Sequence, residues 1–218
     1  MIIDGKKIGL STPPYIIAEL SADHNGSIDS ALNHIKLAKE AGADAVKIQT
    51  YTAETMTLDC DKPDFKITGG LWDGETLFSL YEKAYTPWEW HEKLFDYANE
   101  IGITIFSTPF DETAVDFLES LNTPAYKIAS FEMIDLPLIK KIAQTGKPII
   151  MSTGMASLQE IKEAVEHIYS SGGKYLSILH CVSGYPTPES EMNLLRIKML
   201  QEEFPEVNIG LSDHSLTN

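Results

Sequence analysis

Short apolar stretches recur along the whole chain, and most of them end in a polar side chain that could take part in chemistry. They lie at residues 15–19, 45–49, 103–108, 125–130, 148–153, 175–180 and 208–214. Apolar runs of this length are typical of buried parallel strands. Because helix-period segments lie between most of them, the pattern predicts a (β/α)8 TIM barrel, whose active site gathers at the carboxyl ends of the strands.

The segments between the strands carry helix start and stop signals. Ser27 can cap a helix that Gly42 ends, and Asp111 can cap another. Pro87 suits the first turn of a third. The predicted helices span residues 28–41, 88–100, 112–121, 136–145, 158–170 and 193–203. Residues 1–14 are expected to be a lead-in to the first strand, since Pro13 and Pro14 stop a local helix.

The connection over residues 51–86 is unusually long for a compact domain. Such loops are functional or disordered, and Phe65, Leu71 and Trp72 favour order here. A short amphipathic helix is predicted over residues 77–84. Because the connection follows the second strand, it is expected above the active face of the barrel.

The seventh strand lies at the end of the sequence, whereas a closed barrel needs an eighth. Residues 1–218 are therefore predicted to form one incomplete barrel domain that is C-terminally truncated after the seventh strand. No linker or low-complexity tract divides it.

Composition narrows the classes of partner. Apolar residues make up 43% and charged residues 22% of the chain, as in globular domains. Its 17 basic and 32 acidic residues give a net charge of −15, which argues against binding nucleic acid through phosphate neutralisation. No segment reaches the length of a membrane span. Cys60 and Cys181 are too few for a disulfide framework, so a reduced, cytoplasmic compartment is expected.

Two lysines indicate an anion site. Lys47 and Lys127 lie within apolar strands, where an ammonium group needs a carboxylate or an anionic ligand. Thr108, Ser130 and Ser152 add hydroxyl donors at strand ends, a set that suits a phosphate together with a carboxylate. In the alternative interpretation, each lysine pairs structurally with a barrel glutamate, either Glu19 or Glu132.

The histidines differ in their settings. His214 is the leading metal candidate because neutral imidazole is a common ligand of divalent transition metals, although a histidine near a strand end is more often structural. His24 and His180 also lie near strand ends, and their roles are open. His34, His91 and His167 fall within amphipathic helices and are predicted to be solvated. Glu19, at the end of the first strand, could position water or accept a proton.

Several motifs, taken in order, resemble the sialic acid synthase family. They lie at residues 18–26, 46–50, 107–110, 126–132, 152–155, 185–187 and 210–214, and so span nearly the whole chain. The resemblance implies a TIM barrel followed by a small antifreeze-like domain, which is expected to be absent from residues 1–218. It also implies a homodimer in which that small domain covers the partner's site.

The resemblance implies an activity as well. Members of this family condense phosphoenolpyruvate with an open-chain N-acetylated amino sugar and release phosphate, using a divalent metal such as Mn²⁺ or Mg²⁺. Matching motif positions would bind phosphoenolpyruvate through Lys47, Thr108, Lys127, Ser130, Ser152 and Ser212. The sugar would lie against Glu132, Ser183 and Tyr185, Glu19 would handle the attacking water or its proton, and His214 would bind the metal. The catalytic set is then Glu19, Lys47, Lys127 and Glu132.

Within the family, residues 67–74, 85–90 and 127–132 are closer to the branch that uses a 2,4-diacetamido-2,4,6-trideoxy sugar. Asp23 and Ser183 stand where the neuraminate-forming branch commonly has asparagine. The Asp23 and Ser183 differences favour a sugar other than N-acetylmannosamine. The resemblance also places a second metal histidine on the eighth strand, which is expected beyond Asn218, so this chain would offer only half of the metal ligands.

Two other functions remain open at this point. The barrel could be a class I aldolase in which Lys47 or Lys127 forms a Schiff base with a carbonyl substrate. It could also be a ligand-binding or scaffold protein without catalysis. Trapping with borohydride separates the first alternative from a synthase, and an assay of phosphate release separates the second.

Overall fold

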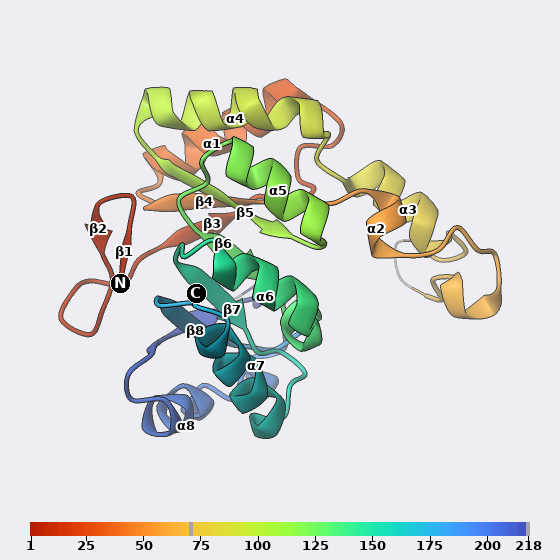
Figure 1. Cartoon of the computed structure of the whole chain (residues 1–218). Helices are drawn as coiled ribbons and strands as arrows, with labels where there is room; N and C mark the ends of the chain where they lie inside the picture. The colour runs from red at the N-terminus through yellow and green to blue at the C-terminus, as the bar shows by residue number, and fades with distance from the viewer. Residues whose placement is uncertain (70–71, 217–218) are drawn as a thin grey trace. The chain divides into compact units, whose positions relative to one another are not determined.

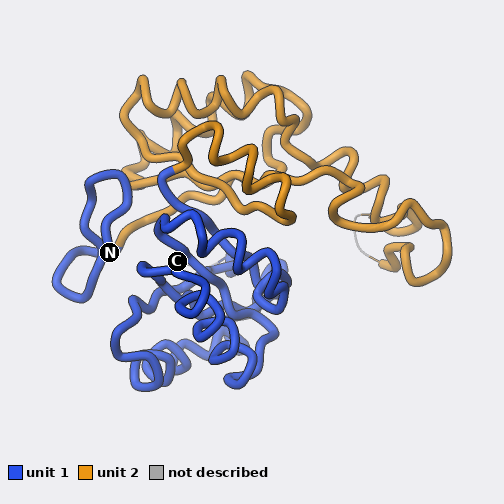
Figure 2. The backbone as a smooth tube through the Cα atoms, in the orientation of Figure 1, with its two compact units in different colours: residues 1–14, 124–218 blue, residues 15–123 orange. Residues whose placement is uncertain are grey.

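The computed structural model describes residues 1–69 and 72–216, which adopt a mixed α/β fold. The chain divides into two compact units (Figure 2). Unit 1 comprises Met1–Pro14 and Pro124–Asn218, and unit 2 comprises Tyr15–Thr123. Leu71, used above to argue for order in the long connection, lies outside the described residues, as does Asn218.

Unit 2 contains three parallel strands in chain order. They are β3 (Ile17–Glu19), β4 (Ala45–Thr50) and β5 (Thr104–Pro109). Glu19 is paired with Lys47 across β3 and β4, and Gln49 with Thr108 across β4 and β5. This register brings the polar ends of the three strands to one edge of the sheet.

Helices connect and cover these strands. They are α1 (Ile28–Glu40), α2 (Ala53–Met56), η1 (Pro63–Phe65), α3 (Leu77–Ala84), α4 (Trp88–Ile101) and α5 (Glu112–Ser120). Helices α1 and α4 pack side by side (Figure 1). The long connection after β4 is therefore ordered into three short helices over its described residues.

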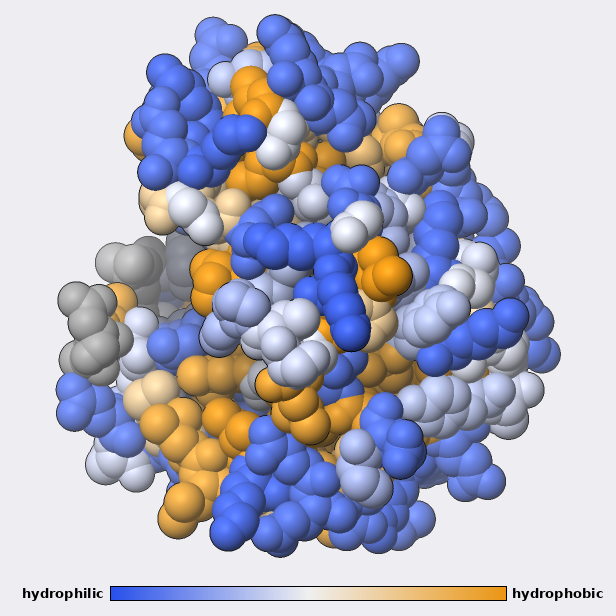
Figure 3. Space-filling view, turned by 90° about the vertical axis from the view of Figure 1, so that its left-hand side faces the viewer, coloured by the Kyte–Doolittle hydropathy of each residue, from blue (hydrophilic) through white to orange (hydrophobic). Residues whose placement is uncertain are grey.

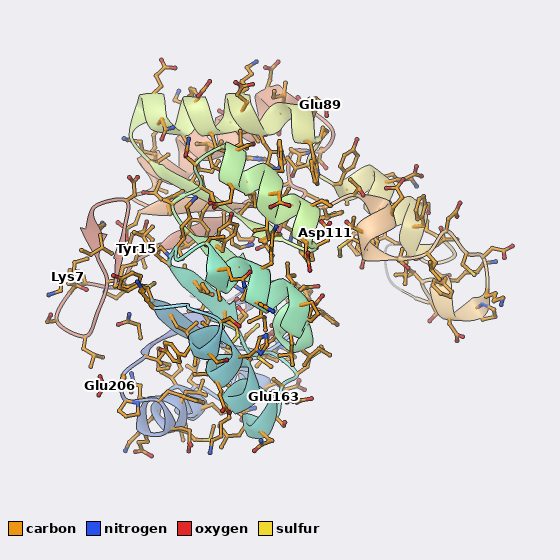
Figure 4. The ribbon with its side chains drawn as sticks, viewed as in Figure 1. Lys7, Tyr15, Glu89, Asp111, Glu163 and Glu206 are labelled. Carbon is orange, nitrogen blue, oxygen red and sulfur yellow. The ribbon has the colours of Figure 1, made fainter. Side chains whose placement is uncertain are left out.

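Local sequence explains where these helices begin and end. The Ser27 hydroxyl accepts a hydrogen bond from the Ser30 amide, and the Asp111 carboxylate accepts from the amides of Thr113 and Ala114. Asp111 lies at the start of α5 in Figure 4. Gly102 ends α4 in a left-handed conformation with φ of 72°, which glycine adopts without steric cost. The predicted caps at Ser27 and Asp111 are confirmed.

Unit 1 contains four parallel strands and a small hairpin. The parallel strands are β6 (Tyr126–Ile128), β7 (Ile149–Ser152), β8 (Leu176–Cys181) and β9 (Asn208–Ser212). The hairpin pairs β1 (Ile2–Ile3) with β2 (Lys6–Lys7). The expected lead-in is thus partly a folded element, whose turn contains Gly5 at a φ of 77°.

Helices of unit 1 follow its strands. They are η2 (Glu132–Ile134), α6 (Leu136–Gln144), α7 (Leu158–Ser170), η3 (Glu189–Glu191) and α8 (Leu195–Glu203). Helices α6 and α7 are neighbours (Figure 1) and bury Ile139, Ile142, Ile161 and Ile168. Alternation of strand and helix is confirmed within each unit, whereas the closed barrel and its truncation stay predictions.

Many polar side chains lie on the surface. Hydrophilic residues cover much of the face in Figure 3, and apolar patches lie between them. Helical residues with acidic side chains contribute to this surface, including Glu89 and Glu163, which Figure 4 labels on α4 and α7. Among the described residues, no helix combines the length and apolar character needed to cross a membrane.

Candidate active site

In unit 2, a buried lysine contacts two polar strand ends. Lys47 is 8% exposed, its Nζ donates a hydrogen bond of 2.9 Å to Thr108 Oγ1, and it forms an ion pair with Glu19. The register of β3, β4 and β5 produces this cluster because Lys47 shares a sheet face with Glu19 and Thr108. Three residues predicted to lie in the site are therefore in contact.

Glu19 reaches from this cluster towards solvent. Its side chain is 43% exposed, and Oε1 accepts hydrogen bonds of 3.0 Å from both the amide and the hydroxyl of Ser21. These bonds hold the carboxylate beside Lys47. The predicted alternative partner of Lys47, Glu19, thus does pair with it. Because the Glu19 side chain is partly exposed, its carboxylate can still contact water.

The opposite face of β4 and β5 carries a polar network that the sequence analysis missed. His91 of α4 is 0% exposed, and its Nε2 lies 2.9 Å from Thr50 Oγ1, which lies 2.6 Å from Ser107 Oγ. Burial lowers the pKa of His91 to about 4, outweighing the opposing effects of the Pro87 and Trp88 backbone and the charge of Glu89. The prediction that His91 is solvated is wrong, because the buried face of α4 includes it.

In unit 1, a second lysine lies within a strand. Lys127 is 5% exposed, and its Nζ donates a 2.7 Å hydrogen bond to the Ile128 carbonyl. Glu132, in η2, has a raised pKa because burial disfavours its charged form, and the positive charge of Lys127 partly opposes this. Its Oε2 is buried without a hydrogen-bond partner. A buried carboxyl group of this kind is able to interact with a ligand hydroxyl or amide.

Small polar groups surround Gly154, just beyond β7. The Gly154 amide donates a 3.1 Å hydrogen bond to Ser130 Oγ. A Cβ at this position would lie 2.4 Å from Ser183 Oγ and 3.0 Å from both Cys181 Sγ and Ser130 Oγ. A larger residue here would force the Ser183 hydroxyl to move. Ser152 Oγ, at the end of β7, is buried and has no hydrogen-bond partner in the structure. A buried hydroxyl of this kind is able to bind a ligand.

A thiol and an imidazole also meet in unit 1. Cys181 is 6% exposed, its Sγ accepts from the Ser130 hydroxyl at 3.6 Å, and His214 Nδ1 lies 3.9 Å away. Burial raises the pKa of Cys181, but hydrogen bonds from His214, Ser130 and Ser212 prevail and bring it to about 7. The bond to Cys181 raises the pKa of His214 in turn, against the effect of burial. Cys181 was not predicted to belong to the site.

The surroundings of His214 define which nitrogen could bind a metal. Its Nδ1 donates a 2.9 Å hydrogen bond to the Val182 carbonyl, which leaves Nε2 as the nitrogen with a lone pair in the neutral ring. The Tyr185 ring lies 4.2 Å from the imidazole, centroid to centroid. His214 thus fits as one metal ligand. Over residues 1–69 and 72–216, no group of three or more His, Cys, Asp or Glu side chains is arranged to hold an ion.

The two histidines left open have structural contacts. His180 is buried, and its Nε2 donates a 2.7 Å hydrogen bond to the Met192 carbonyl. His24 is buried, accepts a hydrogen bond from the Gly26 amide at Nδ1, and lies edge-on to Trp90. Burial lowers the pKa of His24 despite the neighbouring charge of Asp23. Both side chains anchor loops that follow strands.

Each unit therefore gathers lysine, hydroxyl and carboxylate groups at the carboxyl ends of parallel strands, which is the position of ligand sites in α/β enzymes. The sequence model of the NeuB family matches residues 34–218. The chain belongs to the NeuB family.

Curated relatives agree with this assignment. The chain is 50% identical over 201 residues to pseudaminic acid synthase from Campylobacter jejuni, covering 92% of this chain and 58% of the relative. It is 48% identical over 204 residues to pseudaminic acid synthase from Helicobacter pylori, covering 94% and 60%. Identity to an N,N'-diacetyllegionaminic acid synthase from Legionella pneumophila is 36%, covering 97% and 60%. The chain spans about three-fifths of the length of these relatives.

Solved structures show the same fold. N-acetylneuraminic acid synthetase from Leptospira borgpetersenii superposes with a TM-score of 0.87 at 31% identity, covering 99% of this chain and 70% of that one. The spore coat polysaccharide biosynthesis protein SpsE of Bacillus subtilis gives a TM-score of 0.84 at 40% identity, covering 99% and 57%.

Proposed function

We propose that this chain is the catalytic part of a pseudaminic acid synthase. The enzyme condenses phosphoenolpyruvate with open-chain 2,4-diacetamido-2,4,6-trideoxy-L-altrose to give a nonulosonic acid and phosphate. The observation that carries this proposal is the identity of about 50% to two pseudaminic acid synthases, against 36% to a legionaminic acid synthase. The buried lysines and hydroxyl groups at the strand ends supply the anion-binding chemistry that the reaction needs.

The reaction has a defined balance of bonds. C3 of phosphoenolpyruvate forms a bond to the aldehyde carbon of the sugar, and the aldehyde oxygen takes up a proton. Water then attacks C2 and gives up one proton. As the C–O bond to phosphate breaks, the second proton leaves with phosphate and C2 becomes a keto carbon. Phosphoenolpyruvate carries phosphate and carboxylate charges throughout, so fixed cationic and hydroxyl groups stabilise it without reorganisation.

Residues of the chain are assigned to these steps. Lys47, Thr108, Lys127, Ser130, Ser152 and Ser212 bind phosphoenolpyruvate. Glu19, accessible beside Lys47, takes the proton of the attacking water. Glu132, Ser183 and Tyr185 face the sugar, and burial raises the pKa of Glu132.

A divalent ion, Mn²⁺ or Mg²⁺, is part of the proposal, with His214 Nε2 as one ligand. When bound, it supplies Lewis-acid polarisation of the sugar aldehyde. The hydrogen bond from Nδ1 to the Val182 carbonyl holds the imidazole in the tautomer that such a role needs. A homodimer and an antifreeze-like domain after the barrel, which the family resemblance implies, belong to the same proposal. So does a cytoplasmic location, which rests on the cysteine content of the sequence.

Assays of the full-length protein test this function. Phosphate release is measured with phosphoenolpyruvate and Mn²⁺, using 2,4-diacetamido-2,4,6-trideoxy-L-altrose or N-acetylmannosamine as the acceptor. We expect a higher kcat/KM for the diacetamido sugar. With ¹⁸O in the bridging position of phosphoenolpyruvate, the label should appear in phosphate, since the C–O bond breaks.

Other results would contradict the proposal. Equal or better use of N-acetylmannosamine would assign the chain to another branch of the family. Release of phosphate without sugar would indicate a phosphatase. A borohydride-trapped adduct on Lys47 or Lys127 would indicate an aldolase, an outcome that the ion pair of Lys47 with Glu19 disfavours because a Schiff-base lysine must lose its charge.

A further inference from the structure

A buried polar network lies behind the Lys47–Thr108 contact, and the proposed chemistry does not use it. Side chains alternate between the faces of a strand. Thr50 and Ser107 therefore lie on the helix-facing side of β4 and β5, whereas Lys47 and Thr108 lie on the other side. His91 of α4 completes the network, and all three of its members are fully buried.

The hydrogen bonds at His91 have one consistent direction, and the single proton of the Ser107 hydroxyl has two acceptors within reach, Thr50 Oγ1 and the Ile48 carbonyl. A carbonyl can only accept, so His91 Nδ1 donates to the Pro87 carbonyl at 3.1 Å. In the neutral ring Nε2 then accepts from the Thr50 hydroxyl at 2.9 Å. The Ser107 hydroxyl lies 2.6 Å from Thr50 Oγ1 and 3.1 Å from the Ile48 carbonyl. His91 Nε2 thus accepts the proton of the Thr50 hydroxyl, and it sets the orientation of that hydroxyl.

These contacts tie the first turn of α4 to the end of β4. Trp88 adds a parallel connection, because its Nε1 donates a 3.1 Å hydrogen bond to the Tyr51 carbonyl. The Phe117 ring lies against both the Trp88 and His91 rings, at 4.7 and 5.3 Å between centroids. Helix α4 is therefore fixed in position where β4 ends, by directional bonds as well as by apolar packing.

We propose that His91 is a positioning residue of the anion site. Through Thr50 and Ser107 it fixes the ends of β4 and β5, and with them the places of Lys47 Nζ and Thr108 Oγ1. This inference rests on the proposed function, since the anion is taken to be phosphoenolpyruvate. Ser107 immediately precedes Thr108, so a shift of the Ser107 backbone moves the Thr108 hydroxyl directly.

The accuracy with which an anion site must be held explains why a polar network, and not apolar packing alone, lies between α4 and the two strands. Apolar side chains pack in many similar arrangements, whereas a fully paired polar network favours one arrangement. An anion site needs this accuracy, because displacements of about 1 Å in positioned groups can change reaction rates by about a hundredfold.

The test compares variants of His91 with a destabilised control on the same helix. His91→Leu removes the acceptor, whereas His91→Gln keeps a side-chain oxygen that can accept from Thr50. Leu94→Ala opens a cavity one turn along α4, at a residue that is 1% exposed and whose side chain has no hydrogen-bonding group. For each full-length variant, the dissociation constant of phosphoenolpyruvate is measured by calorimetry without sugar, and stability by denaturant titration.

We expect His91→Leu to weaken phosphoenolpyruvate binding by about tenfold or more, and His91→Gln to restore most of the affinity. Leu94→Ala should lower stability and leave the affinity within about threefold of wild type. Near-wild-type affinity in His91→Leu would overturn the inference, and so would an equal loss of affinity in Leu94→Ala.

Lys47→Met separates this inference from the proposed function. Wild-type binding that is lost in Lys47→Met supports the function, and normal binding by His91→Leu would then overturn only the positioning role. Absence of binding by wild-type protein would overturn both.

Discussion

Protonation of His91 is expected to destabilise the protein as the pH falls. His91 is 0% exposed and has a pKa of about 4 in the folded state, against an ordinary value of 6.5. The unfolded chain binds a proton at this side chain more readily than the folded chain does. Stability is therefore complete above pH 6.5 and declines as the pH falls from there towards 4.

The size of the effect follows from the difference between the two pKa values. A pKa difference of one corresponds to about 1.4 kcal/mol, so the full loss approaches about 3 kcal/mol below the folded-state pKa. At pH 5, where the folded-state ring is still largely neutral, the loss is about 2 kcal/mol. This is a large share of the stability of an ordinary domain, which is about 5–15 kcal/mol.

Denaturant titrations at pH 7 and pH 5 measure this loss. Wild type is compared with His91→Gln, which cannot titrate at this position, so the contribution of other groups cancels in the difference. Thr50→Val serves as a matched control: it deletes a hydroxyl of the same network but leaves the buried imidazole in place. We expect it to be less stable than wild type at both pH values and to keep the wild-type pH dependence.

The comparison can refute the reasoning in two ways. An equal loss of stability between pH 7 and pH 5 in wild type and His91→Gln would show that His91 is not buried in the neutral form. A pH dependence that disappears in Thr50→Val as well would mean that general destabilisation, and not titration of the ring, produces the difference.

Three further predictions concern unit 1. Lys127→Met should weaken phosphoenolpyruvate binding by about 1.5–3 kcal/mol or more while circular dichroism stays unchanged, and unaltered affinity in calorimetry would reject its role in the anion site. Gly154→Ala should lower kcat/KM, since a Cβ there would lie 2.4 Å from Ser183 Oγ. Wild-type kinetics would show that the polar groups around Gly154 are not part of the site. His180→Ala should lower the free energy of unfolding by about 1–3 kcal/mol and increase hydrogen exchange around Met192, because the 2.7 Å hydrogen bond to the Met192 carbonyl is lost. Unchanged exchange there would count against an anchoring role.

The sequence predicted the elements of the fold well where pattern and local signals agree. Helix α7 spans Leu158–Ser170, as predicted, because its apolar spacing coincides with a capping box formed by Ser157 and Glu160. Lys47 was correctly placed in a buried strand, since a lone lysine among apolar β-branched residues has few other settings. Its contacts with Glu19 and Thr108 follow from strand register once the order of strands is known.

Other features depend on tertiary structure and were missed. The amphipathic helix pattern predicted a solvated His91, yet this residue lies in the buried stripe together with Leu94, Phe95 and Ala98. Helical spacing from Leu94 and Ala98 could have placed it there. Cys181 was judged only for disulfide and metal spacing. Its contact with His214 joins the end of β8 to the segment that follows β9, and it gives no local sequence signal.

The alternation of side chains along a strand links these correct and missed assignments. In β4, Lys47 and Gln49 lie on one face, while Ile48 and Thr50 lie on the other. The first face provides the cationic group of the candidate site, and the second provides the hydroxyl that bonds to His91. One strand therefore both presents a ligand group and fixes its own position against α4. A residue with no access to substrate can influence binding in this way, because it acts on the backbone that carries the binding group.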